Sequence, residues 1–600
     1  MRQKLVMAVL IFAVLGLAGR AYGDPPLLVK QAQLVAADPA LLAQLGASVA
    51  ISGDTVVGGA PAFFGPGAAY VFVKSGRTTW SQQQKLTATT TGTWSGFGSA
   101  VAISGDTIVV GSPFERGDGN FALGAVYIFV RSGTSWSLQQ KLTPARNDIN
   151  YTTLFGGAVA INGDTILVGH VGDFNGSSPG GSVHAYVWDG TTWSEQQKLV
   201  PTNPANGFFG DAVALDGDTA VIGDGSYHLG SAYIFARSGS FWTLQQRLRA
   251  GATTAGVNFG LAVAIDGETL VVTDPADDAA DFHSGSAYVY TKIGQSWSLQ
   301  QKLTAADPDP PGTIYGKRFG HTVALSGDTL LAGADDDNNQ RGAAYIFDRI
   351  GTSWSQRQKL TNFDDSVSVF GLSVALSGDT AAIGSNWGGP AYGAVYIYAP
   401  VPINHPPLAD AGPDQTVECT TPLGAPVLLD GSRSSDPDED PLTFLWSGPF
   451  GAIGGASPTV QIPLGTSTVT LTVDDGRGGT ASDTAQIAVQ DTTAPVVSVL
   501  TAEPSRLWPP NHKMVPVTLA VAAADRCDPY PGCVIETVTS NEPIAGDVSI
   551  TGPLSLELRA DRAGSGPGRT YSITVGCRDA AGNRSTATVG VLVPHDNSGH

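Results

Sequence analysis

The sequence is poor in charged residues and in the residues that fill helices. Of its 600 residues, 14% are charged and 3 are methionine. Helix-rich proteins draw heavily on Glu, Lys, Leu and Met, so an all-helical protein is excluded. Basic residues are the scarcer charged group, because 33 Lys and Arg stand against 53 Asp and Glu and leave a net charge of -20. No cluster of Lys and Arg offsets this charge, and we expect no nucleic-acid partner.

Long apolar runs are absent except at the amino terminus. Residues 1–23 hold two early basic residues, an apolar run from Leu5 to Ala18 and the small-x-small ending Ala21-Tyr22-Gly23, an order typical of a signal peptide. The alternative is a transmembrane anchor, which needs about 20 apolar residues, and Arg20 interrupts too early. We predict an exported chain, secreted or on the cell surface, with no transmembrane segment after signal cleavage.

Glycine is abundant, with 75 residues, and much of it belongs to an internal repeat. The tripeptide Gly-Asp-Thr occurs six times, and the variant Gly267-Glu268-Thr269 once. The exact copies begin at Gly53, Gly105, Gly163, Gly217, Gly327 and Gly378. Repeats of about 50 residues indicate a propeller or a linear solenoid.

Each copy is predicted to form four antiparallel strands, as the second copy illustrates. Residues 100–104 and 107–111 flank a Gly-Asp turn that closes a hairpin. Residues 126–131 give the third strand, and the polar run 136–142 suits an outer edge strand. Four-stranded units repeated seven times predict a β-propeller with one sheet per blade.

The chain ends distinguish a closed ring from a linear solenoid. Six copies end in a strand that begins with Trp, whereas the seventh passes from Tyr398 directly into a Pro-rich segment. Near the amino terminus, residues 31–38 resemble the outer strand at 301–307. Such a strand would complete the last blade of a ring and has no use in a solenoid. The predicted fold class is all-β, with residues 24–400 forming a seven-bladed β-propeller closed by the N-terminal strand.

Short motifs flank each turn. The second copy has Phe97-Gly98 before the turn and Gly111-Ser112-Pro113 after it, and the other copies vary this pattern. These motifs resemble FG-GAP repeats, the units of the integrin α-type propeller, and the resemblance implies an extracellular ligand-binding or adhesive propeller. One feature departs from the integrin type, because its Asp-x-Asp-x-Asp-Gly calcium loop is replaced here by the Gly-Asp-Thr turn. Calcium is therefore not expected at the turn.

Connections on one face of the predicted ring vary strongly. The first-to-second and third-to-fourth turns are uniform. The connections at the other strand ends differ in length and composition: 114–123, 171–180, 274–284, 305–318 and 335–341. Variable loops on a regular scaffold are where binding usually resides. We expect this face to recognise an extracellular protein or carbohydrate ligand.

Carboxylates are dense in two of these connections. One run is Asp335, Asp336 and Asp337, and the other set is Asp274, Asp277, Asp278 and Asp281. Such oxygen ligands could hold calcium, the only cofactor predicted, and acidic turns without an ion are the alternative. The repeated Asp of the Gly-Asp-Thr turn is interpreted as structural, because Asp tolerates that backbone geometry.

Recurring aromatic residues are interpreted as blade packing, with a carbohydrate platform as the alternative for the Trp series. His184 takes the Tyr position in the third copy, which we interpret as a packing substitution. His170, His228 and His283 fall in the variable connections, where they are expected to be too scattered to act as ligands.

A Pro-rich linker, residues 401–407, is predicted to precede two smaller modules. Residues 408–490 contain Leu429-Asp430-Gly431-Ser432 and a strand ending at Trp446, and they resemble a PKD-type, Ig-like β-sandwich. Residues 491–594 are rich in strand patterns and contain Asp579-Ala580-Ala581-Gly582-Asn583, which resembles HYR-like and bacterial Ig-like modules. Residues 595–600 are a tail. We interpret both modules as spacers.

The modules also contain candidate ligands and crosslinks. Asp436, Asp438 and Asp440 have a spacing that suits calcium, but Pro441 replaces the Gly of an EF-hand-like loop, so an acidic turn is the alternative. The disulfide candidates in an exported chain are Cys527, Cys533 and Cys577. Cys419 lies far from them in the sequence and is expected to be buried and unpaired.

Signatures of common enzymes are absent. The sequence has no HExxH, Gly-x-Ser-x-Gly, Walker or dinucleotide-binding glycine motif. We therefore expect a non-enzymatic binding or adhesion protein with no catalytic residues. The alternatives are an extracellular polysaccharide-active enzyme with a site at the propeller channel, and a structural component of the envelope.

Overall fold

The computed structural model describes residues 25–38, 43–62, 65–88, 94–116, 122–144, 153–175, 178–201, 207–225, 230–250, 258–278, 283–307, 316–362, 367–388, 393–564 and 566–595. The predicted signal peptide, residues 1–23, lies outside the described residues. The chain divides into two compact units, residues 1–402 and 403–600. In the described part of the chain, no helix is long and apolar enough to cross a membrane.

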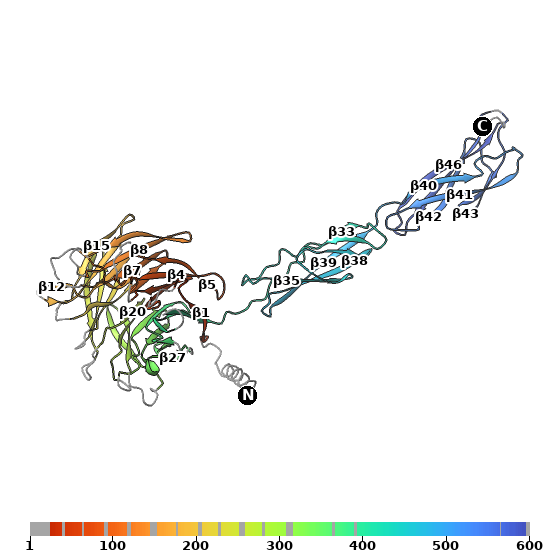
Figure 1. Ribbon diagram of the computed structural model, residues 1–600. Helices are drawn as coiled ribbons and strands as arrows, with labels where there is room; N and C mark the ends of the chain where they lie inside the picture. Colours follow the sequence, from red (N-terminus) through yellow and green to blue (C-terminus); the bar gives the residue numbers. More distant parts are fainter. Residues whose placement is uncertain are drawn as a thin grey trace. The chain divides into compact units, whose positions relative to one another are not determined.

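Seven four-stranded antiparallel sheets make up the first unit (Figure 1). Blade one holds β2 (Ser48–Ser52), β3 (Thr55–Ala60), β4 (Ala68–Lys74) and β5 (Trp80–Leu86), and blade two holds β6 (Ala100–Ser104), β7 (Thr107–Ser112), β8 (Ala125–Ser132) and β9 (Ser135–Leu142). Blade three holds β10 (Phe155–Asn162), β11 (Thr165–His170), β14 (Ser182–Trp188) and β15 (Trp193–Leu199), and blade four holds β16 (Phe209–Asp216), β17 (Thr219–Asp224), β18 (Ser231–Ser238) and β19 (Phe241–Leu248). The four strands predicted for the second copy are thus confirmed.

The remaining blades follow the same pattern. Blade five holds β20 (Val263–Asp266), β21 (Thr269–Asp274), β22 (Ser286–Ile293) and β23 (Ser296–Leu303), and blade six holds β24 (Thr322–Ser326), β25 (Thr329–Ala334), β26 (Ala343–Ile350) and β27 (Ser353–Leu360). Blade seven holds β29 (Ser373–Ser377), β30 (Thr380–Ser385), β32 (Ala394–Pro400) and β1 (Leu28–Leu34). Short elements lie in the connections: β12 (Phe174–Asn175), β13 (Ser178–Pro179), α2 (Asp337–Gln340), β28 (Val367–Ser368) and β31 (Trp387–Gly388).

Blade seven is completed by the amino-terminal strand. Its sheet has the order β1-β32-β30-β29, and β1 pairs antiparallel with β32. The first strands of neighbouring blades contact one another in a closed series that runs β2, β6, β10, β16, β20, β24, β29 and back to β2. The prediction of a propeller closed by the N-terminal strand is confirmed, and a linear solenoid is excluded.

A glutamine in six of the seven outer strands ties that strand to the next blade. The side chain of Gln84 donates to the carbonyl of Trp136 and accepts from its N–H, each at 2.7 Å. The same two bonds join Gln140 to Trp193, Gln197 to Trp242, Gln246 to Trp297 and Gln301 to Trp354. At the closure Gln358 makes both bonds with Leu28 of β1. The amino-terminal strand therefore occupies the place of a Trp strand in the ring.

The Gly-Asp-Thr turns are also joined from blade to blade. In six of the seven turns the glycine N–H donates to a side chain at the end of the preceding blade's first strand. The acceptor and donor pairs are Ser377 and Gly53, Ser52 and Gly105, Ser104 and Gly163, Asp216 and Gly267, Asp266 and Gly327, and Ser326 and Gly378. The turn glycines have φ between 51° and 57°, which favours glycine. The repeated tripeptide is thus a structural element, as predicted.

The Phe-Gly motif sets the approach of neighbouring blades. Phe97 is fully buried and packs edge-on against Tyr127, with ring centroids 5.3 Å apart. A Cβ at Gly98 would lie 2.3 Å from the carbonyl oxygen of Ala68 in blade one. No side chain fits there, so glycine is required for the contact between the blades.

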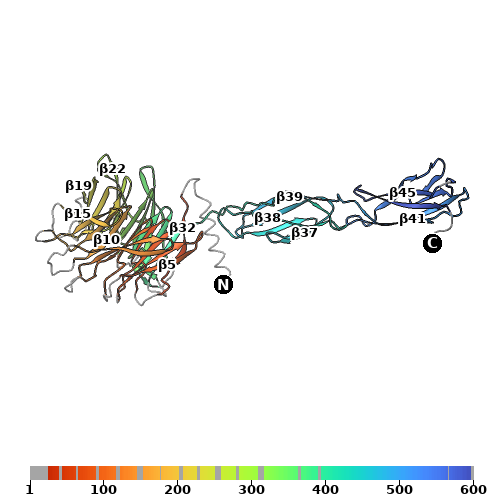
Figure 2. The ribbon, with the colours of Figure 1, turned by 90° about the horizontal axis from the view of Figure 1, so that it is seen from above.

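The second unit contains two modules, each with two sheets around one core. The first module pairs a sheet of β33 (Gln415–Glu418), β39 (Thr480–Gln490), β38 (Gly465–Asp474), β35 (Thr443–Gly448) and β36 (Gly451–Gly454) with β34 (Ala425–Leu428) and β37 (Thr459–Ile462). The second pairs β40 (Val496–Glu503), β41 (Met514–Ala524), β44 (Ser555–Arg559) and β43 (Val548–Gly552) with β42 (Gly532–Ser540), β45 (Gly568–Arg578) and β46 (Arg584–Pro594). Figure 2 shows β38 and β39 side by side. Trp446 is fully buried in the first core, as predicted.

Candidate functional site

The variable connections leave the blades at the same strand ends. In every antiparallel sheet, the second-to-third and fourth-to-first connections lie opposite the Gly-Asp-Thr turns. In blade seven one connection of each kind contributes a short strand, and these strands, β28 and β31, pair with each other. The two kinds of connection therefore meet on one face, which we call the variable-loop face.

Large aromatic side chains are exposed on the variable-loop face. Trp94 is 52% exposed and stacks on Phe114, with ring centroids 5.2 Å apart. Trp387 and Phe208, in other connections, are 47% and 43% exposed. The outer-strand Trp136, by contrast, is buried, in agreement with the packing interpretation of that series. Exposed aromatic rings are typical of recognition surfaces.

Beneath this face a carboxylate, a tyrosine and a lysine recur in contact. In blade two the phenol of Tyr127 donates to Glu115 at 2.8 Å, and Lys141 pairs with the same carboxylate at 2.5 Å. The ammonium of Lys141 also lies 5.2 Å from the Tyr127 ring centroid. Equivalent sets are Tyr288, Asp277 and Lys302 in blade five, and Tyr345, Asp337 and Lys359 in blade six. These carboxylates are counterions of outer-strand lysines.

The run Asp335 to Asp337 is divided between different cationic partners. Asp335 lies 3.1 Å from a ring nitrogen of His321 and 3.3 Å from Arg318. Asp337 accepts from Lys359 at 2.7 Å. Burial opposes the charge of Lys359, but hydrogen bonds to its carboxylate partners outweigh this effect and raise its pKa.

Asp336 faces the same guanidinium as Asp335, because it lies 3.5 Å from Arg318. The carboxylates of the run do not gather into one ligand set among the described residues. Calcium at this run stays a prediction.

The second acidic set holds a fully buried carboxylate. Burial, followed by the charge of Asp277, raises the pKa of Asp274 to about 6. Asp277 itself is paired with Lys302 at 2.7 Å, and Asp278 accepts the N–H of His283 at 2.8 Å. Asp281 lies outside the described residues. In this set Asp277 is therefore a structural counterion, whereas Asp274 is a buried acid.

The structure does bring Asp436, Asp438 and Asp440 together. Their ligand oxygens lie within 4.8 Å of one another. Asp438 accepts from the backbone and the ring of His405, and Asp440 pairs with Arg477 at 3.0 Å. These partners suit an acidic turn, and calcium at this set also stays a prediction.

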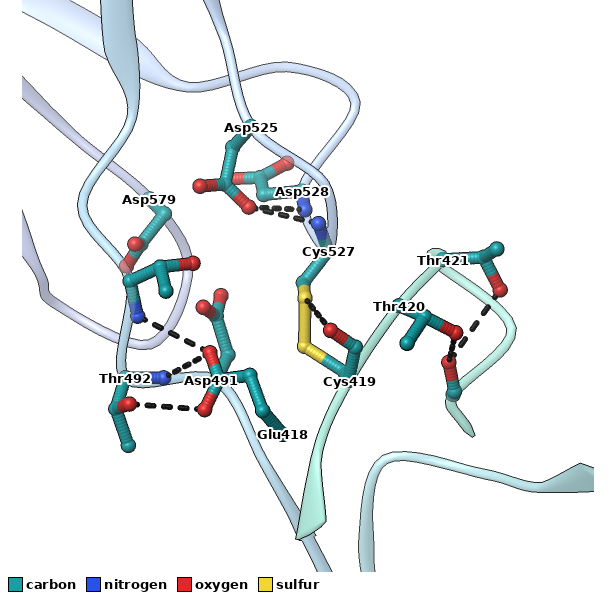
Figure 3. Close-up of a disulfide and its surroundings, with 12 residues drawn as sticks. Glu418, Cys419, Thr420, Thr421, Asp491, Thr492, Asp525, Cys527, Asp528 and Asp579 are labelled. Atoms are coloured by element: carbon teal, nitrogen blue, oxygen red, sulfur yellow. Dashed lines mark hydrogen bonds between the residues drawn. A yellow bond between two sulfur atoms is a disulfide. The ribbon is translucent and has the colours of Figure 1, made fainter. Parts of the chain in front are cut away.

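All four cysteines are paired. Cys533 and Cys577 face each other on β42 and β45 and form one disulfide. Cys419, after β33, is bonded to Cys527, after β41, and so joins the two modules (Figure 3). The expectation that Cys419 is unpaired is wrong, because Cys527 packs against the core of the first module, where Cys419 is buried. A separation of 108 residues hid this pairing in the sequence.

Three carboxylates converge beside the disulfide that joins the modules. The ligand oxygens of Asp491, Asp525 and Asp579 lie within 4.8 Å of one another. Figure 3 shows the three residues beside the disulfide. Burial, and then the charges of Asp525 and Asp579, raise the pKa of Asp491. Sequence reasoning missed this cluster because its members come from three distant segments.

His170, which was predicted to be one of several scattered histidines, lies against His184, which was interpreted as a packing substitution. His228 lies outside the described residues. His170 is the last residue of β11, not a loop residue, and its Nδ1 lies 3.2 Å from Nε2 of His184. Burial lowers the pKa of His170 to about 4. Burial also acts to lower the pKa of His184, but its contacts with Asp173 and Glu195 outweigh this effect and raise it. Packing alone is thus an incomplete description of His184, which makes polar contacts on both ring nitrogens.

Solved structures match this chain with TM-scores below 0.5. The WD40 domain of Toxoplasma gondii coronin matches with a TM-score of 0.40 and 10% identity, over 63% of this chain and 87% of that one. A putative 6-phosphogluconolactonase from Bacteroides uniformis matches with a TM-score of 0.37 and 12% identity, over 53% of this chain and 85% of that one. Likenesses at this level say nothing about activity or ligand.

Two curated relatives match parts of the chain. The dyslexia-associated protein KIAA0319 homolog of Mus musculus is 25% identical over 242 residues, which are 39% of this chain and 21% of the relative. The homolog of Rattus norvegicus is 33% identical over 135 residues, which are 21% of this chain and 12% of the relative. The chain therefore spans about a fifth or less of the length of these relatives.

A family model for the FG-GAP repeat matches seven segments. They are residues 28–72, 80–129, 136–186, 193–235, 242–290, 297–347 and 354–398. Each begins with the outer strand of one blade and continues through three strands of the next, and the first begins with β1. This offset agrees with closure of the ring by the amino-terminal strand. The seven matches together cover more than half of the sequence, and the chain belongs to the FG-GAP repeat family.

Proposed function

We propose that this chain is an exported, non-enzymatic binding protein whose variable-loop face recognises an extracellular protein or glycan. The observation that carries the proposal is the gathering of unequal connections, with the exposed side chains of Trp94 and Trp387, on one face of an FG-GAP propeller. A regular scaffold that presents unequal loops is the usual arrangement of a recognition surface. Trp rings add contact area and stack on the apolar faces of sugars.

Export is part of the proposal. It is supported by the predicted signal peptide and by the pairing of all four cysteines, because disulfides persist mainly in oxidising compartments. The carboxy-terminal modules are proposed to be PKD-type and HYR-like Ig-like spacers. Their support is the two-sheet architecture with one core in each module. Calcium is proposed as a ligand of Asp436, Asp438 and Asp440, whose oxygens converge.

The test uses the full exported chain. We expect saturable binding of the purified protein to at least one partner in a glycan array or in a crosslinking survey of surface proteins. In parallel, the same preparation is incubated with a panel of polysaccharides, and new reducing ends are measured. Binding without cleavage supports the proposal. Cleavage of a polysaccharide, with no partner retained in either survey, contradicts it and favours the enzyme.

A further inference from the structure

Blade three departs from the other blades in one buried cluster. In the other six blades the equivalent third-strand position carries Tyr, as at Tyr127, but in blade three it carries His184. His170 ends the neighbouring strand β11, and Asp173 follows in the next connection. The three residues are only 5%, 1% and 5% exposed for His170, Asp173 and His184.

The polar atoms of this cluster have the spacing of metal ligands. Nδ1 of His170 lies 3.2 Å from Nε2 of His184, and Oδ2 of Asp173 lies 3.6 Å from the former and 3.9 Å from the latter. Around a tetrahedral Zn²⁺ with bonds of about 2.0–2.1 Å, ligand atoms lie about 3.4 Å apart. The three atoms therefore form a triangle close to one face of a zinc coordination tetrahedron.

The surroundings orient the two imidazoles toward this point. Nδ1 of His184 contacts Oε1 of Glu195 at 3.0 Å, and a carboxylate on the outer nitrogen is the usual orienting partner of a metal-bound histidine. The contacts of His170 with His184 and Asp173 are both made by Nδ1, while its Nε2 is buried with no hydrogen-bond partner among the described residues. Phe155 packs edge-on against both imidazoles, with centroid distances of 5.4 Å and 5.5 Å. One side of the cluster is thus apolar.

We propose that blade three holds a divalent transition-metal ion, of which Zn²⁺ is the probe, on His170 Nδ1, His184 Nε2 and Asp173 Oδ2. Two imidazoles and one carboxylate suit Zn²⁺ and Co²⁺ and do not suit calcium. The fourth ligand is the Ser182 hydroxyl or a water molecule. The Ser182 hydroxyl lies 3.2 Å from His184 Nε2 and 2.5 Å from Asp173 Oδ2. The ion would fix the start of the 171–180 connection to the blade, independently of what the variable-loop face recognises.

Lys198 competes with the ion for the carboxylate. Its ammonium lies 2.5 Å from Oδ2 of Asp173, and its side chain is 34% exposed. A side chain with this exposure can turn to solvent when a metal ion takes its place. Removal of the ammonium by Lys198→Gln should therefore strengthen metal binding several-fold.

The experiment titrates ZnCl₂ into the full chain after treatment with a chelator and dialysis. Calorimetry should give one Zn²⁺ per chain, and Co²⁺ should produce the visible absorption of a four-coordinate site. His184→Tyr is the matched variant, because it installs the residue of the other six blades and should fold. It should weaken Zn²⁺ binding at least 10-fold, with an unchanged circular dichroism spectrum.

A control separates this site from the acidic clusters. Asp436→Asn should leave Zn²⁺ binding unchanged, because its carboxylate belongs to another module. The proposal is overturned if the chain binds no stoichiometric Zn²⁺, or if folded His184→Tyr binds Zn²⁺ as tightly as the natural chain. Neither result would affect the proposed recognition by the variable-loop face, which is measured with a different ligand.

Discussion

Several carboxylates beneath the variable-loop face neutralise outer-strand lysines. Lys141 is paired across the strands with Tyr127, and its counterion Glu115 comes from the connection before that tyrosine. The lysine and tyrosine positions can be read from the repeat. Their counterions could not be predicted, because each acid comes from a connection of different length. The acidic connections therefore suggested ion sites when only the sequence was considered.

The stability lost when a lysine in these sets is replaced should depend on how deeply its counterion is buried. Lys359→Met leaves Asp337, which is 1% exposed, without its closest cation. We expect a loss of about 2–4 kcal/mol in the free energy of unfolding, because a buried charge that loses its closest cation is costly. The matched change Lys85→Met affects Asp38, which is 55% exposed, and should cost less than about 1 kcal/mol. Equal losses in urea unfolding would contradict this account.

The buried acid Asp274 predicts a pH dependence of stability. Its ordinary pKa of 3.8 rises to about 6 in the folded chain, so the folded state holds the proton more tightly than the unfolded state. The stabilisation is fully present below pH 3.8 and is lost as the pH rises through 6. Asp274→Asn keeps an acceptor without the charge and should raise the free energy of unfolding by about 3 kcal/mol at pH 7.

The measurement for Asp274 is denaturant unfolding between pH 4 and pH 8. The variant should show a flatter profile than the natural chain. Asp379→Asn, a change at an exposed turn residue, is the control and should leave the profile unaltered. A variant that is less stable than the natural chain at pH 7 would show that the Asp274 charge is favourable in the folded state.

At the scale of elements, the repeat made the blades predictable. Strands recur with the same turns and the same alternation of apolar and polar residues. A strand that is ambiguous in one copy can therefore be assigned from the other copies. The short strands β12, β13, β28 and β31 were not predicted, because they lie in connections that differ between blades and have no second copy for comparison. The pairing of Cys419 with Cys527 was missed for a similar reason, since it joins two modules that share no repeat.

Closure of the ring depends on β1, the strand that lies furthest in the sequence from the rest of its blade. Gln358 holds β1 through two bonds to Leu28, and β1 has no covalent link to the blade that it completes. Gln358→Ala should speed amide hydrogen exchange in β1 and β32 by roughly 10-fold, as expected for the loss of about 1–2 kcal/mol. Gln246→Ala removes the same two bonds at an interface where the chain is continuous. That control should leave exchange in β1 and β32 unchanged; acceleration there in both variants would show that closure is not the weak point.

At the scale of the whole molecule, the disulfide between Cys419 and Cys527 joins two modules with separate cores. The double variant Cys419→Ser/Cys527→Ser should keep both cores but expose the connection around residues 491–495 to proteases. Limited proteolysis followed by mass spectrometry measures the cleavage rate there. Cys533→Ser/Cys577→Ser, which removes a crosslink within one module, is the control. Unchanged cleavage in the first variant would show that the disulfide does not hold the connection.

Recognition by one face of the propeller can be tested with exposed apolar residues on its two faces. Trp94 and Trp387 lie on the variable-loop face, whereas Ile293 and Ile350, 64% and 68% exposed, lie at the third-to-fourth turns opposite. The measurement is the affinity of the full chain for its captured glycan or protein. Trp94→Ala/Trp387→Ala should weaken binding at least 10-fold, and Ile293→Ser/Ile350→Ser should leave it unchanged. Loss of binding in the isoleucine variant, with full binding in the tryptophan variant, would contradict the assignment of the recognition face.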